Sequence, residues 1–561
     1  MRRELKYILN IAKINKRETN RIITFSLLYI LLEAVIPFFV RELLNSITRG
    51  EALYIIKLFS GVIILYSFTR LFWAFSDYEV AKLKICAKGD LKKRLHEKMI
   101  KLPINYFSHN LPGEIITKMT ADVEIIGENS PLLPAILSAF IEIIVIGFVL
   151  FKLNPILALI TIATFPIYSI LEKRYKPRLE KSAEEERKAS DPIVEMIREN
   201  IAGIFTLKLF KPYKYLESIF NKKIDEWKKI SKYRAQCFYV YYGLTSYIEY
   251  TLPLVILGVG SILVANRAVD FPTVVAFFAF VSRVYVPVWN INFLLTTIPG
   301  AYPSIRRILE ILEHPEEKIT IGDSFPKIID KIILKDVSFS YDRGKILREL
   351  NLEIQGKSWT AVVGATGNGK TTLCLLLSGL YKPESGFILL NGKPYSNYDS
   401  TQLSKNIIYV PNKDFIFNAS LKDNLTFGEI YNEHEIKNIC EICCIDEFTK
   451  DLNVNATNFS DGQKQRIALA RALLRKPSFI ILDETFAAID SKIEEIIVYN
   501  IKKNYPALTV VVVSHRLSTI HNADQIVVMK DGRIIATGTH SLLSKNCEEY
   551  RILFERQYII D

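Results

Sequence analysis

The 561-residue sequence predicts two domains of different fold class, an all-α domain of six membrane-spanning helices followed by an α/β domain. Three observations lead to this division. The first half contains long apolar stretches, the second half alternates strand-like and helix-like runs, and a segment rich in Pro, Gly and charge separates the halves at 313–327. We therefore expect a membrane domain at 1–315, a linker at 316–330 and an α/β domain at 331–561.

Six apolar stretches in the first half have nearly the length of a bilayer-spanning helix. About 20 helical residues cross the hydrocarbon at a rise of about 1.5 Å per residue. The expected spans are Ile22–Leu44, Phe59–Tyr78, Leu132–Lys152, Pro155–Leu171, Phe238–Ala265 and Val274–Ile298. The basic N-terminal segment precedes an apolar stretch too long for a signal peptide, so we expect it to remain in the mature chain.

The net charge of +12 is compatible with nucleic acid or an anionic membrane surface as a partner. Lys and Arg gather between the apolar stretches, mainly at 82–101 and 173–234, which favours membrane lipid and argues against nucleic acid. Positive segments stay in the cytoplasm. We therefore expect a multi-pass protein of the cell membrane, with the N-terminus, both long basic segments and the C-terminal half in the cytoplasm.

The basic segments are predicted to be helical extensions of the spans, because their apolar residues recur at helical spacing. The stretches 108–114 and 208–214 interrupt this pattern and are the expected turning points at the cytoplasmic tips. Within the spans, five ionisable residues are costly in lipid unless they face a partner or a cavity. They are Glu33, Arg70, Glu142, Glu249 and Arg283.

The fifth span also contains five tyrosines between residues 239 and 250. One interpretation of these polar groups is hydrogen bonding between helices and anchoring at the interface. The other is a polar, aromatic cavity that suits an amphipathic or peptide-like substrate better than a bare ion. The sequence leaves both open.

The second half contains a glycine-rich loop in "TAVVGATGNGKTTLCLLLSGL". A buried strand at 360–363 leads into G-x-x-x-x-G-K-T, and an apolar helix follows, which is the context of a P-loop. Backbone N–H groups of such a loop wrap the phosphates of ATP, while Lys370 reaches the β- and γ-phosphates and Thr371 offers a hydroxyl to Mg²⁺. The candidate nucleotide-binding residues here are Gly364, Thr366, Gly367, Asn368, Gly369, Lys370, Thr371 and Thr372.

Two carboxylates end the buried strand "SFIILDE" at 478–484. Asp483 is placed to support Mg²⁺, and Glu484 to polarise the attacking water. Before this strand, "NFSDGQKQRIALARALL" sets a polar element on the N-terminus of an amphipathic helix. Helix N-termini have unpaired N–H groups and partial positive charge, so this element is a candidate for binding phosphate.

With these motifs, the chain resembles the ATP-binding cassette (ABC) transporters, and more closely a half-size exporter with an N-terminal membrane domain fused to a C-terminal cassette. The segment 101–124 is similar to the exporter pattern around the first coupling helix, and 199–210 is similar to the approach to the second. The resemblance implies an α/β P-loop NTPase fold, an ABC ATPase, for the second domain. ATP and Mg²⁺ are the implied cofactors.

The resemblance also implies roles for single residues. Tyr341 is similar to the aromatic residue that stacks on adenine, Asp490 to the D-loop aspartate and His515 to the switch histidine at the γ-phosphate. The family signature corresponds to 459–463, where Ser460, Asp461, Gly462 and Gln463 close over ATP bound to a second cassette. Asn412 stands at the position of the Q-loop glutamine, so the implied metal site is Thr371, Asn412 and Asp483, and the implied catalytic residues are Glu484, His515 and Lys370.

Two departures from the family pattern concern the site. Asp461 replaces a glycine, which puts a carboxylate near the γ-phosphate, where the helix dipole offsets part of the repulsion. The side chain of Asn412 is shorter than that of glutamine by one C–C bond, roughly 1.5 Å, so we expect slower hydrolysis. The segment 453–458 also lacks the usual Gly-Glu before the signature.

The implied function is ATP-driven export of an amphipathic substrate (peptide, antibiotic, lipid or drug) by alternating access of a dimer. A second copy of the chain is the favoured partner, and a homologous half-transporter is the alternative. An ATP-gated channel or channel-regulating subunit on the same scaffold is the second hypothesis, against which the intact Glu484 argues. Six fused spans argue against a soluble ATPase acting on nucleic acid. An importer is disfavoured because importers usually keep the two domains on separate chains.

Overall fold

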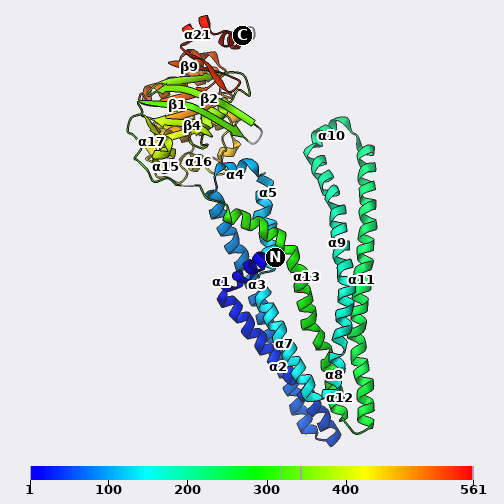
Figure 1. The fold of residues 1–561 in the computed structure, drawn as a ribbon. Coiled ribbons are helices and arrows are strands. Elements are labelled where there is room, and N and C mark those ends of the chain that lie inside the picture. The colour runs from blue at the N-terminus through cyan, green and yellow to red at the C-terminus, as the bar shows by residue number, and fades with distance from the viewer. Residues whose placement is uncertain (1, 111, 318, 342–343, 559–561) are drawn as a thin grey trace. The chain divides into compact units, whose positions relative to one another are not determined.

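A computed structural model describes residues 2–110, 112–317, 319–341 and 344–558 (Figure 1). The chain divides into two compact units, Met1–Leu102 with His109–Pro315, and Pro103–Ser108 with Glu316–Asp561. The first unit is all-α and the second is α/β, which confirms the predicted fold class.

Helices account for nearly all of the chain before residue 315. They are α1 (Arg2–Ile14), α2 (Lys16–Arg49), α3 (Ala52–Ile100), α4 (Ile104–His109), α5 (Pro112–Thr117), the π-helix η1 (Lys118–Asp122), α6 (Val123–Glu128), α7 (Leu132–Leu153), α8 (Pro155–Ile162), α9 (Thr164–Ala202), α10 (Ile204–Phe210), α11 (Tyr213–Ala265), α12 (Phe271–Val281), the 3₁₀ turn η2 (Ser282–Val284) and α13 (Tyr285–Glu313). Among the described residues, six helical segments are long and apolar enough to span a membrane.

Two of the predicted spans are divided rather than continuous. The fourth changes from α8 to α9 around Ala163, and the sixth is broken by η2. Pro287 explains the second break, because a proline lacks the N–H group for the helical hydrogen bond and its ring clashes with the carbonyl four residues earlier, here that of Arg283. The sixth span, predicted as one helix at 274–298, is therefore corrected to two helices joined by a 3₁₀ turn.

The basic segments are helical, as predicted. Helix α3 has 49 residues and α11 has 53, which correspond to about 74 and 80 Å and exceed the roughly 30 Å of hydrocarbon. Figure 1 shows α9 and α11 running side by side, joined by the short α10. The chain turns after α10 at Lys211, which has a left-handed φ of 51°, and Pro212 follows before α11 begins.

The five ionisable residues of the spans differ in their interaction partners and burial. Arg283 forms an ion pair with Glu33, which agrees with the first interpretation, hydrogen bonding between helices. Glu142 is buried, and Trp289 donates a hydrogen bond to Glu249. The guanidinium of Arg70 lies 4.8 Å from the centre of the Tyr66 ring. Interhelical pairing thus accounts for part of this set.

The second unit contains two sheets. A four-stranded antiparallel sheet has the order β2-β1-β4-β5. A six-stranded sheet has the order β10-β9-β3-β8-β7-β6. In this second sheet β9, β3, β8, β7 and β6 run parallel to one another, and β10 is antiparallel to β9. The strands are β1 (Lys331–Tyr341), β2 (Gly344–Gln355), β3 (Trp359–Val363), β4 (Ser385–Leu390), β5 (Lys393–Pro394), β6 (Ile407–Val410), β7 (Phe479–Asp483), β8 (Thr509–Val513), β9 (Gln525–Lys530) and β10 (Arg533–Gly538).

Helices and 3₁₀ turns connect these strands. They are α14 (Lys370–Leu377), η3 (Tyr395–Asn397), α15 (Ser400–Asn406), α16 (Leu421–Thr426), α17 (Glu433–Ile442), η4 (Ala456–Asn458), α18 (Asp461–Leu474), α19 (Ser491–Asn504), α20 (Leu517–His521), α21 (His540–Asn546) and α22 (Glu548–Tyr558). Strand β3 is buried on both faces, because Ala361 and Val363 pack into one hydrophobic core and Val362 into a second. Such burial explains the continuous apolar runs that the sequence shows.

The parallel strands bring four predicted segments to one edge of the sheet. Strand β3 ends at the glycine-rich loop, β7 ends at Asp483, β8 is followed by His515, and β6 is followed by Asn412. Because the strand order is β3-β8-β7-β6, the carboxyl ends of these strands are neighbours. Ligands of open α/β sheets bind at this edge.

Candidate functional site

The glycine-rich loop has a backbone that needs glycine. Gly367 and Gly369 both have a φ of 88°, a left-handed value that costs little without a Cβ. A Cβ on Gly364 would lie 2.4 Å from the carbonyl oxygen of Met529. The loop therefore passes close to the end of β9 and then turns directly into α14. This leaves the N–H groups at the start of α14 available for an anion.

Lys370 is the first residue of α14, and its side chain folds back over the loop. Its Nζ donates to the carbonyl oxygens of Gly364 at 2.7 Å and of Ala365 at 3.1 Å. Burial lowers the pKa of Lys370, and the nearby carboxylates Glu484 and Asp483 oppose this shift. A buried cation at the N-terminus of a helix is suited to binding phosphate.

The other predicted residues of the loop differ in their surroundings. Thr366 is exposed, whereas Asn368 is tied to the protein: its Nδ2 donates to the carbonyl oxygen of Met529 at 2.9 Å, and its Oδ1 accepts from the backbone N–H of Asp531 at 3.4 Å. A hydrogen bond joins Thr372 to Tyr341. Asn368 and Thr372 thus hold the loop in place with their side chains.

Tyr341, the candidate for stacking on adenine, belongs to an aromatic cluster. Its ring centre lies 4.9 Å from that of Phe339 and 5.8 Å from that of Tyr381, and both pairs are nearly perpendicular. Edge-to-face packing of this kind fixes the ring orientation. The hydrogen bond to Thr372 links this cluster to the helix that starts in the P-loop.

Asp483 is buried at the end of β7 and has two hydrogen-bond donors. The hydroxyl of Tyr409 donates to its Oδ2 at 3.0 Å, and Thr371 also donates to the carboxylate. Burial raises the pKa of Asp483, and both hydrogen bonds oppose the shift. Mg²⁺ prefers oxygen ligands, so the adjacent hydroxyl of Thr371 and carboxylate of Asp483 fit this ion.

Glu484 lies beside two other predicted residues. Its Oε2 accepts a hydrogen bond from Nδ2 of Asn412 at 3.0 Å, and its Oε1 lies 3.2 Å from Nε2 of His515. Both carboxylate oxygens are thus oriented. A carboxylate held in this way can accept the proton of an attacking water.

The signature segment caps helix α18. The Oγ of Ser460 accepts from the backbone N–H of Gln463 at 3.4 Å, and Oε1 of Gln463 accepts from the backbone N–H of Ser460 at 2.8 Å. This capping box occupies the side chain of Gln463 within its own helix. Asp461 is exposed in the first turn, where the helix dipole favours a negative charge. This explains why an aspartate is tolerated at this position.

Gly462 is required for a close approach. A Cβ at this position would lie 2.4 Å from the carbonyl oxygen of Ala488, in the loop that follows Glu484. The same loop ends at Asp490, which caps α19 by accepting from the backbone N–H of Lys492 at 2.9 Å. The start of α18 therefore packs directly on this loop.

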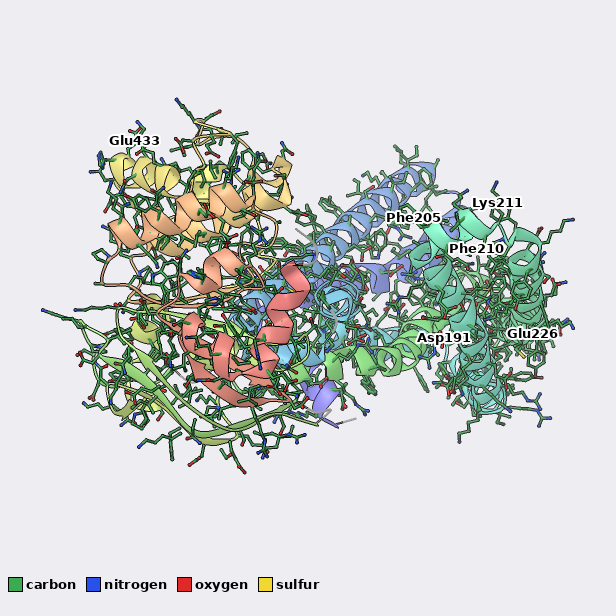
Figure 2. All side chains as sticks on the ribbon, turned by 90° about the horizontal axis from the view of Figure 1, so that it is seen from above. Asp191, Phe205, Phe210, Lys211, Glu226 and Glu433 are labelled. Carbon is green, nitrogen blue, oxygen red and sulfur yellow. The ribbon has the colours of Figure 1, made fainter. Side chains whose placement is uncertain are left out.

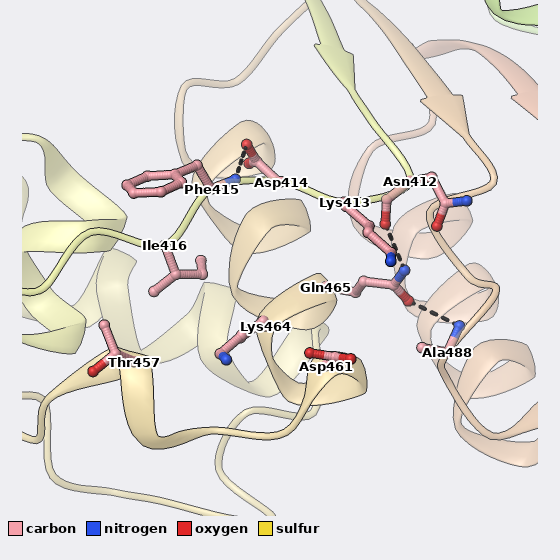
Figure 3. A pocket seen from close by; sticks show the side chains of 10 residues that line it. All are labelled: Asn412, Lys413, Asp414, Phe415, Ile416, Thr457, Asp461, Lys464, Gln465 and Ala488. Carbon is pink, nitrogen blue, oxygen red and sulfur yellow. Dashed lines mark hydrogen bonds between the residues drawn. The ribbon is translucent and has the colours of Figure 1, made fainter. Parts of the chain in front are cut away.

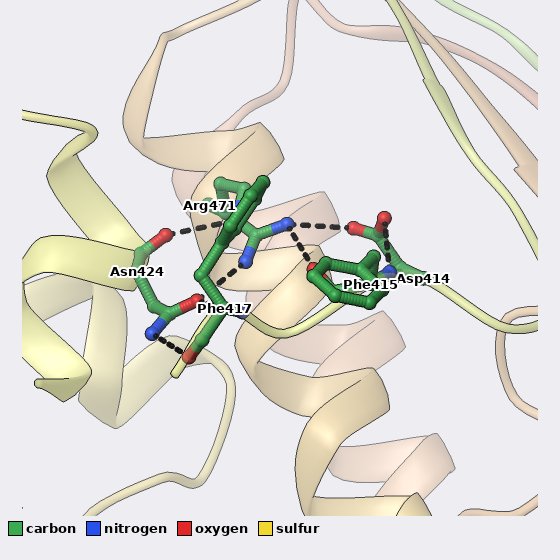
Figure 4. A network of polar contacts seen from close by, with 5 residues as sticks. All are labelled: Asp414, Phe415, Phe417, Asn424 and Arg471. Carbon is green, nitrogen blue, oxygen red and sulfur yellow. Dashed lines mark hydrogen bonds and ion pairs between the residues drawn. The ribbon is translucent and has the colours of Figure 1, made fainter. Parts of the chain in front are cut away.

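Sequence reasoning missed two buried polar residues of α18. Gln465 joins the loops after β6 and β7, and it borders a cavity of about 390 Å³ (Figure 3). Arg471 donates to the carboxylate of Asp414 at 3.0 Å and to the carbonyl oxygen of Asn424 at 2.8 Å (Figure 4). Their signal was present in the sequence, since both are polar residues in a helix that is buried along most of its length.

Comparisons with known proteins match both halves of the chain. The family model described as the ABC transporter transmembrane region matches residues 21–288, and the model described as ABC transporter matches residues 347–487. The chain belongs to the ABC transporter family. Both parts are fused in one chain, so this ABC transporter is an exporter-type half-transporter, and it is an ATPase coupled to transport across a membrane.

Curated relatives cover most of this ABC transporter. It is 28% identical over 484 residues to the uncharacterized ABC transporter ATP-binding protein YknU of Bacillus subtilis, covering 83% of this chain and 82% of that protein. It is 29% identical over 535 residues to the lactococcin-G-processing and transport ATP-binding protein LagD of Lactococcus lactis, covering 92% and 75%.

The fold has a solved counterpart. A structure of a bacterial Atm1-family ABC exporter with ATP bound matches with a TM-score of 0.81 and 21% identity, covering 97% of this chain and 98% of that one. The six spanning helices and the P-loop domain of this ABC transporter thus follow the exporter fold. ATP binding is implied by the family match of the second domain.

Proposed function

We propose that this ABC transporter exports an amphipathic substrate by alternating access of a dimer. The observation that supports this best is the gathering of Asn412, Glu484 and His515 at the sheet edge that also holds the P-loop. Hydrolysis at this edge would drive the membrane helices between inward- and outward-facing states. The proposed domain limits are those predicted, 1–315, 316–330 and 331–561, with the N-terminus and the ATPase domain in the cytoplasm.

The proposed ATP site needs two chains. Among the described residues, Ser460, Asp461 and Gly462 make no hydrogen bond or ion pair with the P-loop of their own chain. The signature is therefore available for ATP on a partner, and Glu484 and His515 in each chain would make both sites of a homodimer competent. Thr371, Asp483 and Asn412 would hold Mg²⁺, which neutralises charge on the phosphates.

Helix α10 supports a partner surface. Phe205, Leu209 and Phe210 are 89%, 75% and 74% exposed on this short helix, and Figure 2 shows Phe205, Phe210 and Lys211 at the tip of the hairpin of α9 and α11. Contiguous exposed apolar groups mark sites of protein association. A second copy of the chain is the proposed partner, and a homologous half-transporter is the alternative.

The tyrosines of α11 support an aromatic substrate cavity. Tyr239, Tyr247 and Tyr250 are 68%, 69% and 71% exposed, and their spacing puts them on one face of the helix. A tyrosine presents an apolar ring with a polar tip, which suits an amphipathic molecule. The relative LagD is described as a lactococcin-G-processing and transport protein, so a peptide is among the proposed substrates.

The proposal is tested by reconstituting the purified protein in liposomes and measuring ATP hydrolysis with a panel of peptides, lipids and cationic drugs. Stimulation by at least one amphipathic class, with transport of that compound into inside-out vesicles, is expected. Ion conductance that persists without hydrolysis would instead favour a channel, a role that no feature of the site supports.

A further inference from the structure

The side-chain amide of Gln465 joins two loops of the ATPase site (Figure 3). Its Nε2 donates to the backbone carbonyl of Asn412 at 2.7 Å, and its Oε1 accepts from the backbone N–H of Ala488 at 3.0 Å. The residue is 7% exposed. Because both ends of the amide are bonded, its orientation is fixed, and neither loop can shift without breaking a partly buried hydrogen bond.

Gln465 also lies next to the signature. It is one turn after Ser460 and Asp461, at the start of α18. Gly462 packs against the same loop, because its Cβ position is 2.4 Å from the carbonyl oxygen of Ala488. The first two turns of α18 are therefore attached to the loop after β7 by a direct backbone contact and by a hydrogen bond.

A second attachment holds the other loop to the same helix. Arg471 donates to the carboxylate of Asp414 at 3.0 Å and to the carbonyl oxygen of Phe415 at 3.1 Å (Figure 4). The segment from Asn412 to Phe415 is thus fixed to α18 at two points, Gln465 and Arg471. A displacement of α18 must move Asn412 with it.

Asn412 in turn contacts the carboxylate of Glu484, because its Nδ2 donates a hydrogen bond to that group. We propose that Gln465 is a positioning residue for ATP hydrolysis: it holds Asn412 so that Glu484 is oriented, and it transmits displacement of the signature to Glu484 of the same chain. The second part rests on the proposed function, in which the signature meets ATP on the partner. ATP binding at one site would then change the orientation of Glu484 at the other site.

The experiment compares Gln465→Leu with wild type in purified full-length protein, with Gln355→Leu, an exposed glutamine on β2, as the matched control. Leucine has a similar size but cannot form either hydrogen bond. We expect kcat for ATP to fall about tenfold, the order for losing the hydrogen bond that holds Asn412. KM should change less than about twofold because the P-loop is untouched. The Hill coefficient for ATP should be above 1 in wild type and close to 1 in the variant. The control should match wild type in all three.

A double-mutant cycle separates positioning from a general structural role. If Gln465 acts through Asn412, adding Gln465→Leu to Asn412→Ala should lower kcat little further. Additive losses, or a wild-type Hill coefficient of 1, would overturn the proposed route. Gln465→Glu is the second variant: it keeps an acceptor for Ala488 but sets a carboxylate against the Asn412 carbonyl, so it should lower kcat as Leu does.

If both Gln465 variants have the kcat and the Hill coefficient of the wild-type protein, this inference is contradicted, whereas the proposed function is not affected. Absence of ATP hydrolysis by the wild-type protein would contradict the proposed function together with it.

Discussion

Asn412 and Glu484 are joined by a hydrogen bond of 3.0 Å between Nδ2 and Oε2. His515 reaches the other oxygen of the same carboxylate at 3.2 Å. Glu484 also has a left-handed φ of 50°, which is costly for a residue with a Cβ and persists where the surrounding structure imposes it. Side chain and backbone thus both hold the carboxylate at the sheet edge where ATP is expected.

Replacing Glu484 with Gln should abolish turnover and trap ATP between two chains. The amide has the same shape but cannot accept a proton from water, and general-base catalysis contributes about 10² to 10⁴ in rate. We expect kcat to fall at least about hundredfold while ATP increases the dimer fraction in size-exclusion chromatography. The matched control is Glu495→Gln on the exposed face of α19. Wild-type turnover in Glu484→Gln would remove Glu484 from this role.

Lengthening Asn412 to Gln should speed hydrolysis. The extra C–C bond of roughly 1.5 Å lets the amide oxygen reach further toward the proposed Mg²⁺, while the Nδ2 of the present side chain donates to Glu484. We expect the ATPase rate to rise about two- to fivefold in the purified protein. Asn412→Ala, which removes the contact with Glu484, should lower it. An equal or slower rate for Asn412→Gln would show that side-chain length does not limit hydrolysis.

Adding one methyl group at Gly462 should disturb the site without touching the P-loop. The new Cβ would lie 2.4 Å from the backbone oxygen of Ala488, and overpacking of this kind costs about 1–3 kcal/mol. We expect a lower melting temperature and a lower kcat for Gly462→Ala. Gly89→Ala, where nothing lies within 4 Å of the added Cβ, is the control. Equal melting temperatures for the two variants would contradict the close packing.

The ion-pair network of Arg471 should contribute strongly to stability. Arg471→Met removes the donor to Oδ2 of Asp414 and to the carbonyl of Asn424. Breaking a fully buried pair costs about 3–5 kcal/mol, and this pair is partly buried, so the cost should lie toward the lower end of that range. We expect a clear drop in the melting temperature of the detergent-purified protein. Arg475→Met, in which an exposed arginine is lost, should change it little. Similar melting temperatures for both would mean that the network is replaceable.

Much of the fold could be predicted because its signals are local. Apolar length gave the six spans, and the strand, glycine loop and helix around Lys370 are contiguous in sequence. The proximity of Asn412, Glu484 and His515 could also be predicted, because each follows a strand of the sheet and the carboxyl ends of parallel strands share one edge. These predictions depend on hydropathy and on sheet geometry, not on detailed packing.

The remaining features depend on contacts between distant segments. The pair of Arg283 with Glu33 spans 250 residues, and no local pattern selects one partner for each charge. The bridge of Gln465 requires the register of α18 against two loops, which is set by side-chain packing.

The central claim is that each ATP is bound by two chains, and mixing two inactive variants tests it most directly. Lys370→Met disables the P-loop, and Ser460→Arg blocks the signature, so each variant alone should lack ATPase activity. In a mixed dimer, the intact P-loop of one chain meets the intact signature of the other, so co-assembly should restore roughly a quarter of the wild-type rate if dimers form at random. If the mixture stays as inactive as its components while mixed dimers are shown to form, ATP is not shared between chains and the account is wrong.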